Sequence, residues 1–524
     1  MTEGRGRSRA LEGGPGALHA LALLVHLSVV ASYNGLHAQC PDGSPPPCRA
    51  AVARTLAPNS VAVLYFDNLS RDSADAYLAD GMTEEIIVQL GRVGRLLVKS
   101  QAAVRRYRGE PDPLAVGRTL RVMHLVSGSL RRAGSRLRVN VELTRVQSGD
   151  RVWGELYDRD AADLLAIQQD IAQTVATAIT GRLLPAERRS LVARPTASPE
   201  AYDRFLHGNY FLAQRTVRSF GRAIEEYEAA VRLDPRFTAA LARIAYAHAL
   251  SMYWGWDVRG VPPESVLARG LAAADRALRL DSMSSDVWMA RGYLLTSLHV
   301  RTYEGVDAAF ARAIALDSAN AEAYHQYAGI LTELGRDSSA AVACHHALQL
   351  EPDRPITLVE LADLSYLTRR FAEARRWLDS ALAVDPSFQF AYAFRAAARL
   401  HLGDTAGARG DAETAARLSA GLSIPAEALL VLTAVRAGDT TAALTRLDRL
   451  LNVNVAERPN RPSQPAYWLS AALVGVGKTE RAFEILNRLQ PRGVRLWYYL
   501  RYPEFDSVRS DPRFQRLVEE SRPR

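Results

Sequence analysis

The sequence predicts an α/β domain followed by an all-α superhelical solenoid built from stacked helix pairs. Two observations carry this prediction. Before residue 190, short apolar runs of strand type alternate with amphipathic helical stretches. After residue 200, a Leu/Val–Asp/Glu motif returns at nearly constant spacing, which is typical of repeat proteins.

Composition narrows the class of protein. A chain of 524 residues is too long for one hydrophobic core, and 48% hydrophobic with 23% charged residues is ordinary globular usage. The formal net charge is +8, mostly from arginine, but the basic residues are scattered among acidic ones. Because no basic stripe or tail emerges, we expect no nucleic-acid partner.

Residues 1–38 have the order of an export signal. Three arginines, Arg5, Arg7 and Arg9, precede the apolar run Ala17–Ala31, and a small-residue site ends at Ala38. We predict a signal peptide cleaved after Ala38, or a signal anchor if it is retained. The first outcome gives a periplasmic or secreted protein, and the second gives inner-membrane anchoring with membrane association through the N-terminus.

Residues 39–58 are expected to form a Pro-rich linker with a cysteine pair. Cys40 and Cys48 flank a turn-rich segment, so in an oxidising compartment they are candidates for a small disulfide loop. Two unpaired thiols remain the alternative, and lipidation of Cys40 is a further one. Cys344 lies in a predicted helix and is expected to be a buried apolar residue. No metal site is expected, because no histidine pair stands near these cysteines.

Residues 59–190 contain the predicted α/β domain. Short β-type runs, several separated by Gly turns, alternate with stretches of helical period. The predicted strands are 60–66, 96–98, 124–130, 136–145 and 152–157, and the predicted helices are 77–93, 113–120 and 164–183. Residues 185–199 are expected to link this domain to the repeats.

Two polar clusters in this domain could carry chemistry. Asp67, Asp80, Glu84 and Glu85 follow the first strand, where α/β domains often bind ligands. The competing interpretation is that Asp80 or Thr83 caps a helix and the glutamates stabilise its first turn. A second cluster, Arg105, Arg106 and Arg108, is interpreted as a solvated basic face, with a phosphate or acidic partner as the alternative.

The repeats begin at about residue 200. The motif ends at Pro235, Ser282, Ser318, Pro352 and Pro386, and Leu418 continues the series, with spacings of 47, 36, 34, 34 and 34 residues. Small residues such as Ala340, Cys344 and Ala347 recur where two helices would cross closely, and glycine recurs at the turn between them. This pattern resembles the tetratricopeptide repeat (TPR). We predict about eight units over residues 200–496 and a C-terminal capping helix over 497–524.

One motif in the repeats is misleading. Gly475–Thr479 resembles a phosphate-binding loop, but the full loop requires a glycine where Ala472 stands and a strand before it. Residues 467–474 have helical period instead, so Gly477 is expected at the turn of a repeat.

The α/β domain also resembles a known family. The segments Ser60–Ser70, Tyr77–Ile87, Val126–Arg132, Arg138–Leu143 and Trp153–Arg159 are, in order, similar to the TolB-like amino-terminal domain. The resemblance implies a bacterial protein, because this domain is commonly joined to TPR units in bacteria. Similar proteins often add a cyclase, kinase or winged-helix output module. Only about 58 residues precede the domain here, so none is expected, and the family supplies no catalytic residues.

These features predict a non-enzymatic interaction scaffold, or a sensory or accessory protein, of the bacterial cell envelope. A protein or peptide partner would bind the concave surface of the solenoid. The candidate contacts are His325, Gln326, Arg395 and Arg399. We expect no catalytic residues, no cofactor and no metal. The alternatives are a membrane-tethered regulatory module of a cyclase, kinase or transcription-regulator system that lacks its own output domain, and a hydrolase that uses the α/β domain.

Overall fold

The structure is a computed structural model that describes residues 56–110, 112–192, 194–214, 216–254, 260–419, 423–452 and 464–524. The predicted signal segment and the Cys40–Cys48 pair lie outside the described residues. Within the described part, no helix combines the length and apolar character needed to span a membrane.

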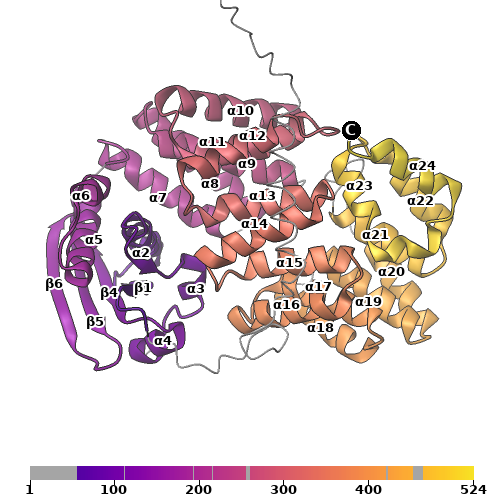
Figure 1. The fold of residues 1–524 in the computed structure, drawn as a ribbon, viewed down its shortest axis with the longest axis horizontal. Coiled ribbons are helices and arrows are strands. Elements are labelled where there is room, and N and C mark those ends of the chain that lie inside the picture. Colours follow the sequence, from indigo (N-terminus) through magenta and orange to yellow (C-terminus); the bar gives the residue numbers. More distant parts are fainter. Residues whose placement is uncertain are drawn as a thin grey trace, which may run out of the picture. The chain divides into compact units, whose positions relative to one another are not determined.

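The α/β domain is built on one mixed sheet (Figure 1). Strands β1 (Ser60–Val63), β3 (Leu97–Val98) and β4 (His124–Ala133) are parallel, and the short β2 (Asp67–Asn68) also pairs with β4. Strands β5 (Arg136–Arg145) and β6 (Arg151–Asp160) extend the sheet as antiparallel hairpins. The turns before β5 and β6 contain Gly134 and Gly149, both with positive φ, as hairpin turns require.

Helices cover both faces of the parallel strands. Helices α2 (Ala76–Gly91) and α5 (Leu164–Thr180) pack on one face, where Ile86, Leu90 and Ile171 are fully buried. Helices α3 (Gln101–Arg105) and α4 (Pro113–Leu120) cover the other face. Near-continuous apolar strands such as Val61–Val63 need cover on both sides, which explains this layering.

One local expectation for this region was wrong. Helix α2 begins at Ala76, so Asp80 and Thr83 lie inside it and cap nothing. Thr83 instead accepts a hydrogen bond from the backbone N–H of Phe66 (3.0 Å) and so ties the helix to the first strand. The predicted linker contains an amphipathic helix, α6 (Pro185–Val192), whose Leu191 is fully buried.

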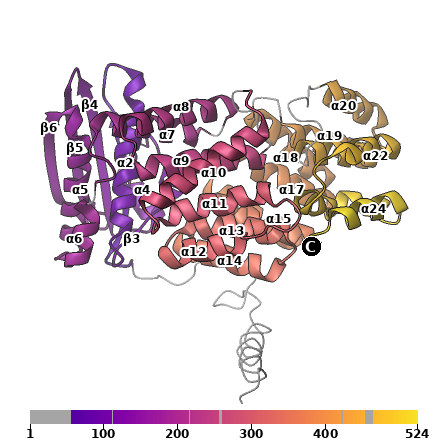
Figure 2. The ribbon, with the colours of Figure 1, turned by 90° about the horizontal axis from the view of Figure 1, so that it is seen from above.

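Within the described residues, eight antiparallel helix pairs follow in a TPR-like solenoid (Figure 2). Each pair has a first and a second helix, and the first helices of successive pairs neighbour one another. The pairs are α7 (Pro199–Ala213) with α8 (Val217–Leu233), α9 (Thr238–Trp254) with α10 (Pro263–Leu280), α11 (Ser285–Leu298) with α12 (Val306–Leu316), α13 (Ala321–Glu333) with α14 (Asp337–Leu350), α15 (Pro355–Leu367) with α16 (Phe371–Val384), α17 (Gln389–His401) with α18 (Thr405–Leu418), α19 (Ile424–Arg436) with α20 (Thr440–Asn452), and α21 (Gln464–Gly475) with α22 (Thr479–Arg488).

In four of these pairs, the second residue after the first helix is a glycine with positive φ: Gly335, Gly403, Gly438 and Gly477. A left-handed residue at this point lets the chain reverse after the first helix, and glycine adopts it without a Cβ penalty. Gly477 therefore belongs to a helix–helix turn, as predicted, and not to a phosphate loop. Helix pair α15–α16 is different, because Arg369 takes the left-handed conformation there (φ 60°).

The first repeat helix joins the solenoid to the α/β domain. The Tyr202 hydroxyl on α7 donates to Oε1 of Gln168 on α5 (2.7 Å), and Nε2 of Gln168 donates to the Gly81 carbonyl on α2 (3.2 Å). Leu206 lies directly over Gly81, where a Cβ would stand 2.9 Å from its Cδ2 atom. Three helices therefore share one buried hydrogen-bonded contact.

Replacing Tyr202 by phenylalanine is expected to lower the free energy of unfolding by about 1–2 kcal/mol, because Oε1 of buried Gln168 loses its donor. Urea unfolding followed by circular dichroism measures this loss. Tyr392→Phe is the matched control, because its hydroxyl bonds the Pro386 carbonyl at an exposed site. Equal effects of the two substitutions would contradict the buried role of Tyr202.

The C-terminal region, expected to be a single capping helix, contains α23 (Val494–Leu500), a 3-10 helix η3 (Pro503–Val508) and α24 (Pro512–Ser521). Helix α24 packs against α22 of the last pair. Helix α23 instead packs against α13, four pairs earlier in the chain (Figure 1). The region therefore contacts both the end and the middle of the solenoid.

Candidate partner-binding surface

The first helices present a set of polar and aromatic side chains to one segment of the chain, residues 493–509. We call this set the first-helix face. Its members come from the first helices α9, α13, α15 and α21, except Asp337, which is the first residue of α14: Tyr253, Glu333, Asp337, Asp363, Tyr366 and Tyr467. We call residues 493–509 the C-terminal segment.

Arg495 is the most deeply placed arginine of the C-terminal segment. Its guanidinium donates to Glu333 (3.1 Å) and to the Tyr253 carbonyl, and it lies 3.8 Å from the centre of the Tyr253 ring. Glu333 is 2% exposed and also accepts from the Tyr303 hydroxyl. A buried carboxylate with two donors can hold its charge beside a cation, so this is a charge-specific contact.

Arg501 makes the second charged contact. It donates to both carboxylate oxygens of Asp337 (2.9 and 3.0 Å) and to the Thr332 carbonyl (2.7 Å). Both contacts to Asp337 come from Nη2, and Nη1 donates to the Thr332 carbonyl, so one guanidinium joins a carboxylate and a backbone carbonyl. Arg495 and Arg501 thus bind Glu333, the last residue of α13, and Asp337, the first residue of α14.

Asp363 on α15 receives two tyrosine hydroxyls from the C-terminal segment. The Tyr498 hydroxyl donates to Oδ2 (2.7 Å), and the Tyr502 hydroxyl donates to Oδ1. Burial raises the pKa of Asp363, and it raises the pKa of Glu360 on the same helix as well. Burial therefore favours the neutral form of these two carboxyls, and the tyrosine hydroxyls oppose this effect at Asp363.

One contact has the opposite polarity. Glu504 of the C-terminal segment accepts from the hydroxyls of Tyr366 on α15 and Tyr467 on α21. Burial raises the pKa of the Glu504 carboxyl, and the two tyrosine donors oppose that rise. This contact fixes the direction of the segment, because an arginine placed here would find hydroxyls and no carboxylate.

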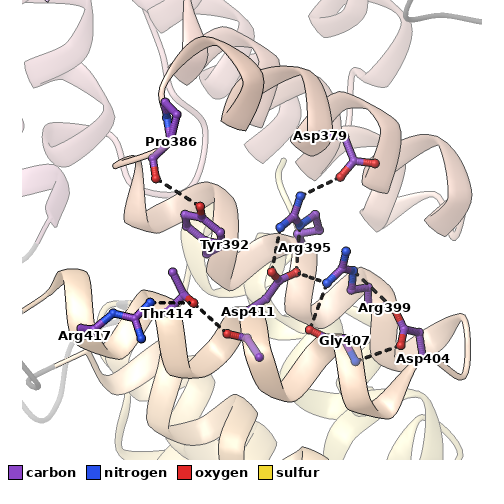
Figure 3. Close-up of polar contacts among 11 residues, drawn as sticks. Asp379, Pro386, Tyr392, Arg395, Arg399, Asp404, Gly407, Asp411, Thr414 and Arg417 are labelled. Atoms are coloured by element: carbon purple, nitrogen blue, oxygen red, sulfur yellow. Dashed lines mark hydrogen bonds and ion pairs between the residues drawn. The ribbon is translucent and has the colours of Figure 1, made fainter. Parts of the chain in front are cut away.

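The arginines expected to contact a partner are engaged by second helices of their own and of the preceding repeat (Figure 3). Arg395 donates to both oxygens of Asp411 on α18 (2.8 Å each) and to Asp379 on α16 (2.8 Å). Arg399 pairs with Asp411 (3.0 Å) and donates to the Gly407 carbonyl (3.1 Å). Both side chains thus bind second helices. A partner-binding role for them stays a prediction.

His325 and Gln326 also contact neighbouring helices. His325 is 8% exposed, and its Nδ1 atom lies 3.4 Å from the Thr357 hydroxyl on α15. Gln326 donates to Glu322 (2.7 Å) and to the Tyr246 hydroxyl on α9 (3.3 Å). His325 and Gln326 lie on α13, whereas Arg395 and Arg399 lie on α17, two helix pairs further along, and a common partner-binding role for the four stays a prediction.

The residues that do converge were not predicted. The available signal was a set of carboxylates inside largely apolar first helices, Glu333 and Asp363, together with the aromatic and basic run from Arg495 to Tyr502. The carboxylates and the aromatic and basic run can each be recognised in the sequence separately. Their pairing depends on contacts between residues more than 130 positions apart, which no local pattern encodes.

The acidic and basic clusters predicted in the α/β domain meet one another. Arg108 pairs with Asp80 (2.9 Å) and lies 4.2 Å from the centre of the Tyr65 ring. Glu84 accepts from Gln101 and, at 3.5 Å, from the Tyr65 hydroxyl. Arg106 donates to the Ala383 carbonyl at the end of α16 (2.7 Å). Arg105, Arg106 and Arg108 are all exposed, as a solvated basic face requires, and they also pair with groups of the protein itself.

Glu84 should make stability depend on pH. Burial raises the pKa of its carboxyl to about 7, although Arg105 opposes the rise. The folded state then holds this proton more tightly than the unfolded state. The contribution of Glu84 to the free energy of unfolding is complete below about pH 4.5. It falls as pH rises to about 7 and is constant above that value. Urea unfolding at pH 5, 6, 7 and 8 should show this loss in the wild type and a shallower one in Glu84→Gln. Parallel curves would contradict the assignment.

Comparison with known proteins identifies one curated relative. The chain is 32% identical over 223 residues to "Putative adenylate cyclase 3" of Rhizobium meliloti (strain 1021), which is 42% of this chain and 38% of that protein. The chain thus spans well under half the length of this relative. No family model matches the chain.

Solved structures of other helical repeat proteins are similar only in part. Yeast Tom70 is 14% identical with a TM-score of 0.40, over 85% of this chain and 92% of its own. A TPR protein from Parabacteroides merdae is 14% identical with a TM-score of 0.36, over 53% of this chain and 99% of its own. The type IV pilus biogenesis factor PilW is 20% identical with a TM-score of 0.35, over 41% and 95%. The assignment of a TPR-like solenoid depends on the helix pairs described above.

Proposed function

We propose that this protein is a non-enzymatic scaffold that binds a protein or peptide segment on its first-helix face. One observation carries the proposal: this face already holds a polypeptide segment, residues 493–509, through side chains of α9, α13, α15 and α21. A surface that recognises arginine, tyrosine and carboxylate groups along an extended contact is suited to peptide recognition.

The organisation of the solenoid supports this proposal. The second helices stack through small residues, such as Ala340, Ala374 and Ala408, which are fully buried and leave no room for a ligand. The first-helix face instead offers hydroxyls and carboxylates from several repeats. Binding energy can therefore be distributed over several repeats, as in other solenoids.

Photo-crosslinking tests where partners bind. Peptides selected from a random library on the full chain, each carrying a photoreactive residue, should crosslink to the first helices α9, α13, α15 and α21. The expected footprint is confined to these helices and the C-terminal segment. Crosslinks confined to the second helices or to the sheet would contradict the proposal.

A second candidate function follows from the curated relative. Its name associates part of this sequence with a cyclase system, so the chain could be a membrane-tethered regulatory module of a signalling system. We propose no catalysis by this chain, and incubation with ATP and Mg²⁺ or Mn²⁺ should form no cyclic AMP. Formation of cyclic AMP by the purified chain would overturn this part of the proposal.

We also propose that the α/β domain is TolB-like and that the protein is bacterial and exported to the cell envelope. The motif order in residues 59–190 and the basic–apolar–small order of residues 1–38 support this. Sequencing the N-terminus of the mature protein should show cleavage after Ala38. An intact N-terminus in the membrane fraction would favour the anchored form instead.

A further inference from the structure

We propose that residues 493–509 are an intramolecular ligand that a partner displaces, and that this partner presents two arginines with tyrosine between them. The inference rests on the proposed function and adds the chemistry of the partner and its competition with the chain's own C-terminal segment. In the segment itself, two of the three arginines stand six residues apart, at 495 and 501, with Tyr498 midway.

Charge selects the occupant of this surface. Glu333, Asp337 and Asp363 contact the segment. Arg495 pairs with Glu333, and Arg501 pairs with Asp337. If the segment left and nothing replaced it, buried Glu333 and Asp363 would lose the donors that stabilise their charge. Tyrosine hydroxyls can serve Asp363, but a peptide without arginine cannot supply a guanidinium to Glu333 and Asp337, so an arginine-bearing peptide is favoured.

Two strained residues hold this network. Among the described residues, the non-glycine residues with positive φ are Arg121, Tyr303 and Arg369. Tyr303 donates to Glu333, the partner of Arg495. Arg369 donates to the Arg501 carbonyl (3.0 Å) and to Asp506 (2.6 Å). Such backbone strain persists where surrounding contacts enforce it, and it gathers at ligand clamps.

Arg369 is informative because glycine occupies the same turn in four other helix pairs. At this position the chain has arginine, which costs conformational energy in the solenoid, and its side chain binds the C-terminal segment. The helix pair itself would fold more easily with glycine. The arginine is therefore better explained by binding of residues 501–506 than by folding of the α15–α16 pair.

The position of the segment allows exchange. It follows the last helix pair, so its departure leaves the helix pairs α7–α22 connected as before. As long as it remains tethered, its effective concentration at the surface is high, and a free peptide must compete against it. A variant that holds its internal segment more weakly should therefore bind an external peptide more readily than the wild type does.

The test uses the full chain with Arg369→Gly, which removes two contacts to the segment and leaves a turn that suits glycine. A labelled peptide of residues 493–509 is titrated by fluorescence anisotropy, and hydrogen exchange follows residues 494–508 of the protein. The matched control peptide carries glutamine in place of Arg495 and Arg501 and keeps Arg509. If Arg369→Gly fails to fold, Arg501→Gln weakens the same segment without changing the turn.

We expect the arginine peptide to bind the variant at least ten-fold tighter than the glutamine peptide and at least ten-fold tighter than it binds the wild type. Binding should also increase hydrogen exchange in residues 494–508. Equal affinity of the two peptides, or binding that leaves the segment protected, would overturn the inference. The scaffold proposal would survive that result if library peptides still crosslink to the first helices, and it fails separately if none does.

Discussion

Replacing Asp411 by alanine is expected to lower the free energy of unfolding by about 3–5 kcal/mol, since it leaves two poorly exposed guanidiniums without their shared partner. Asp411 is 6% exposed and binds Arg395 and Arg399 at 2.8 and 3.0 Å (Figure 3). Arg395 keeps only Asp379, which lies on the preceding second helix. Chemical unfolding of the full chain measures the loss.

Glu413→Ala on the same helix is the matched control. Its pair with Arg409 is exposed on both sides, so its removal should change stability by less than about 0.5 kcal/mol. A loss at Asp411 no larger than the loss at Glu413 would mean that Arg395 and Arg399 are not held by it. The two arginines would then be available for the partner contact predicted from sequence.

Replacing Glu333 by alanine is expected to cost about 3–5 kcal/mol as well, because Arg495 would remain buried with a carbonyl but no carboxylate. Tyr303 would also lose its acceptor. The effect should be local to the C-terminal segment, so hydrogen exchange in residues 494–508 should rise before exchange in α15 or α17 does. Exchange measured together with urea unfolding checks both statements.

Glu484→Ala provides the control for Glu333, because its pair with Arg481 is half exposed on both sides. If Glu333→Ala leaves exchange in residues 494–508 unchanged, the segment is held by its apolar residues, Leu496, Leu500 and Phe505, which are also buried. In that case charge would not select the occupant, and the competition proposed above would lose its basis.

Helix pairs and hairpins could be predicted from the sequence because the patterns that indicate them are local. The 34-residue spacing places Gly335 and Gly403 at equivalent turns, and both have the positive φ that such a turn requires. Gly134 lies in the turn that joins β4 to β5, and Gly149 lies in the turn that joins β5 to β6. Period and turn chemistry act over a few residues, so they can be recognised without knowing what packs against them.

The limits of the helices and the roles of individual side chains were harder to predict from the sequence. Asp80 has the composition of a cap, but α2 begins at Ala76 because apolar contacts with the sheet extend the helix toward its N-terminus. For Asp80, tertiary packing overrode a local preference. For Arg395 and Arg399, no local pattern in the sequence indicated that Asp411, from the next helix, pairs with both.

The sequence by itself determined that the chain has an α/β domain and a row of helix pairs, because periodicity decides which faces must be buried. The tertiary structure decided which polar groups meet, because Arg495 and Glu333 are 162 residues apart and their charges can be buried only together. Burial of a charge requires a partner at a defined place in space, and spacing along the chain carries no record of that place.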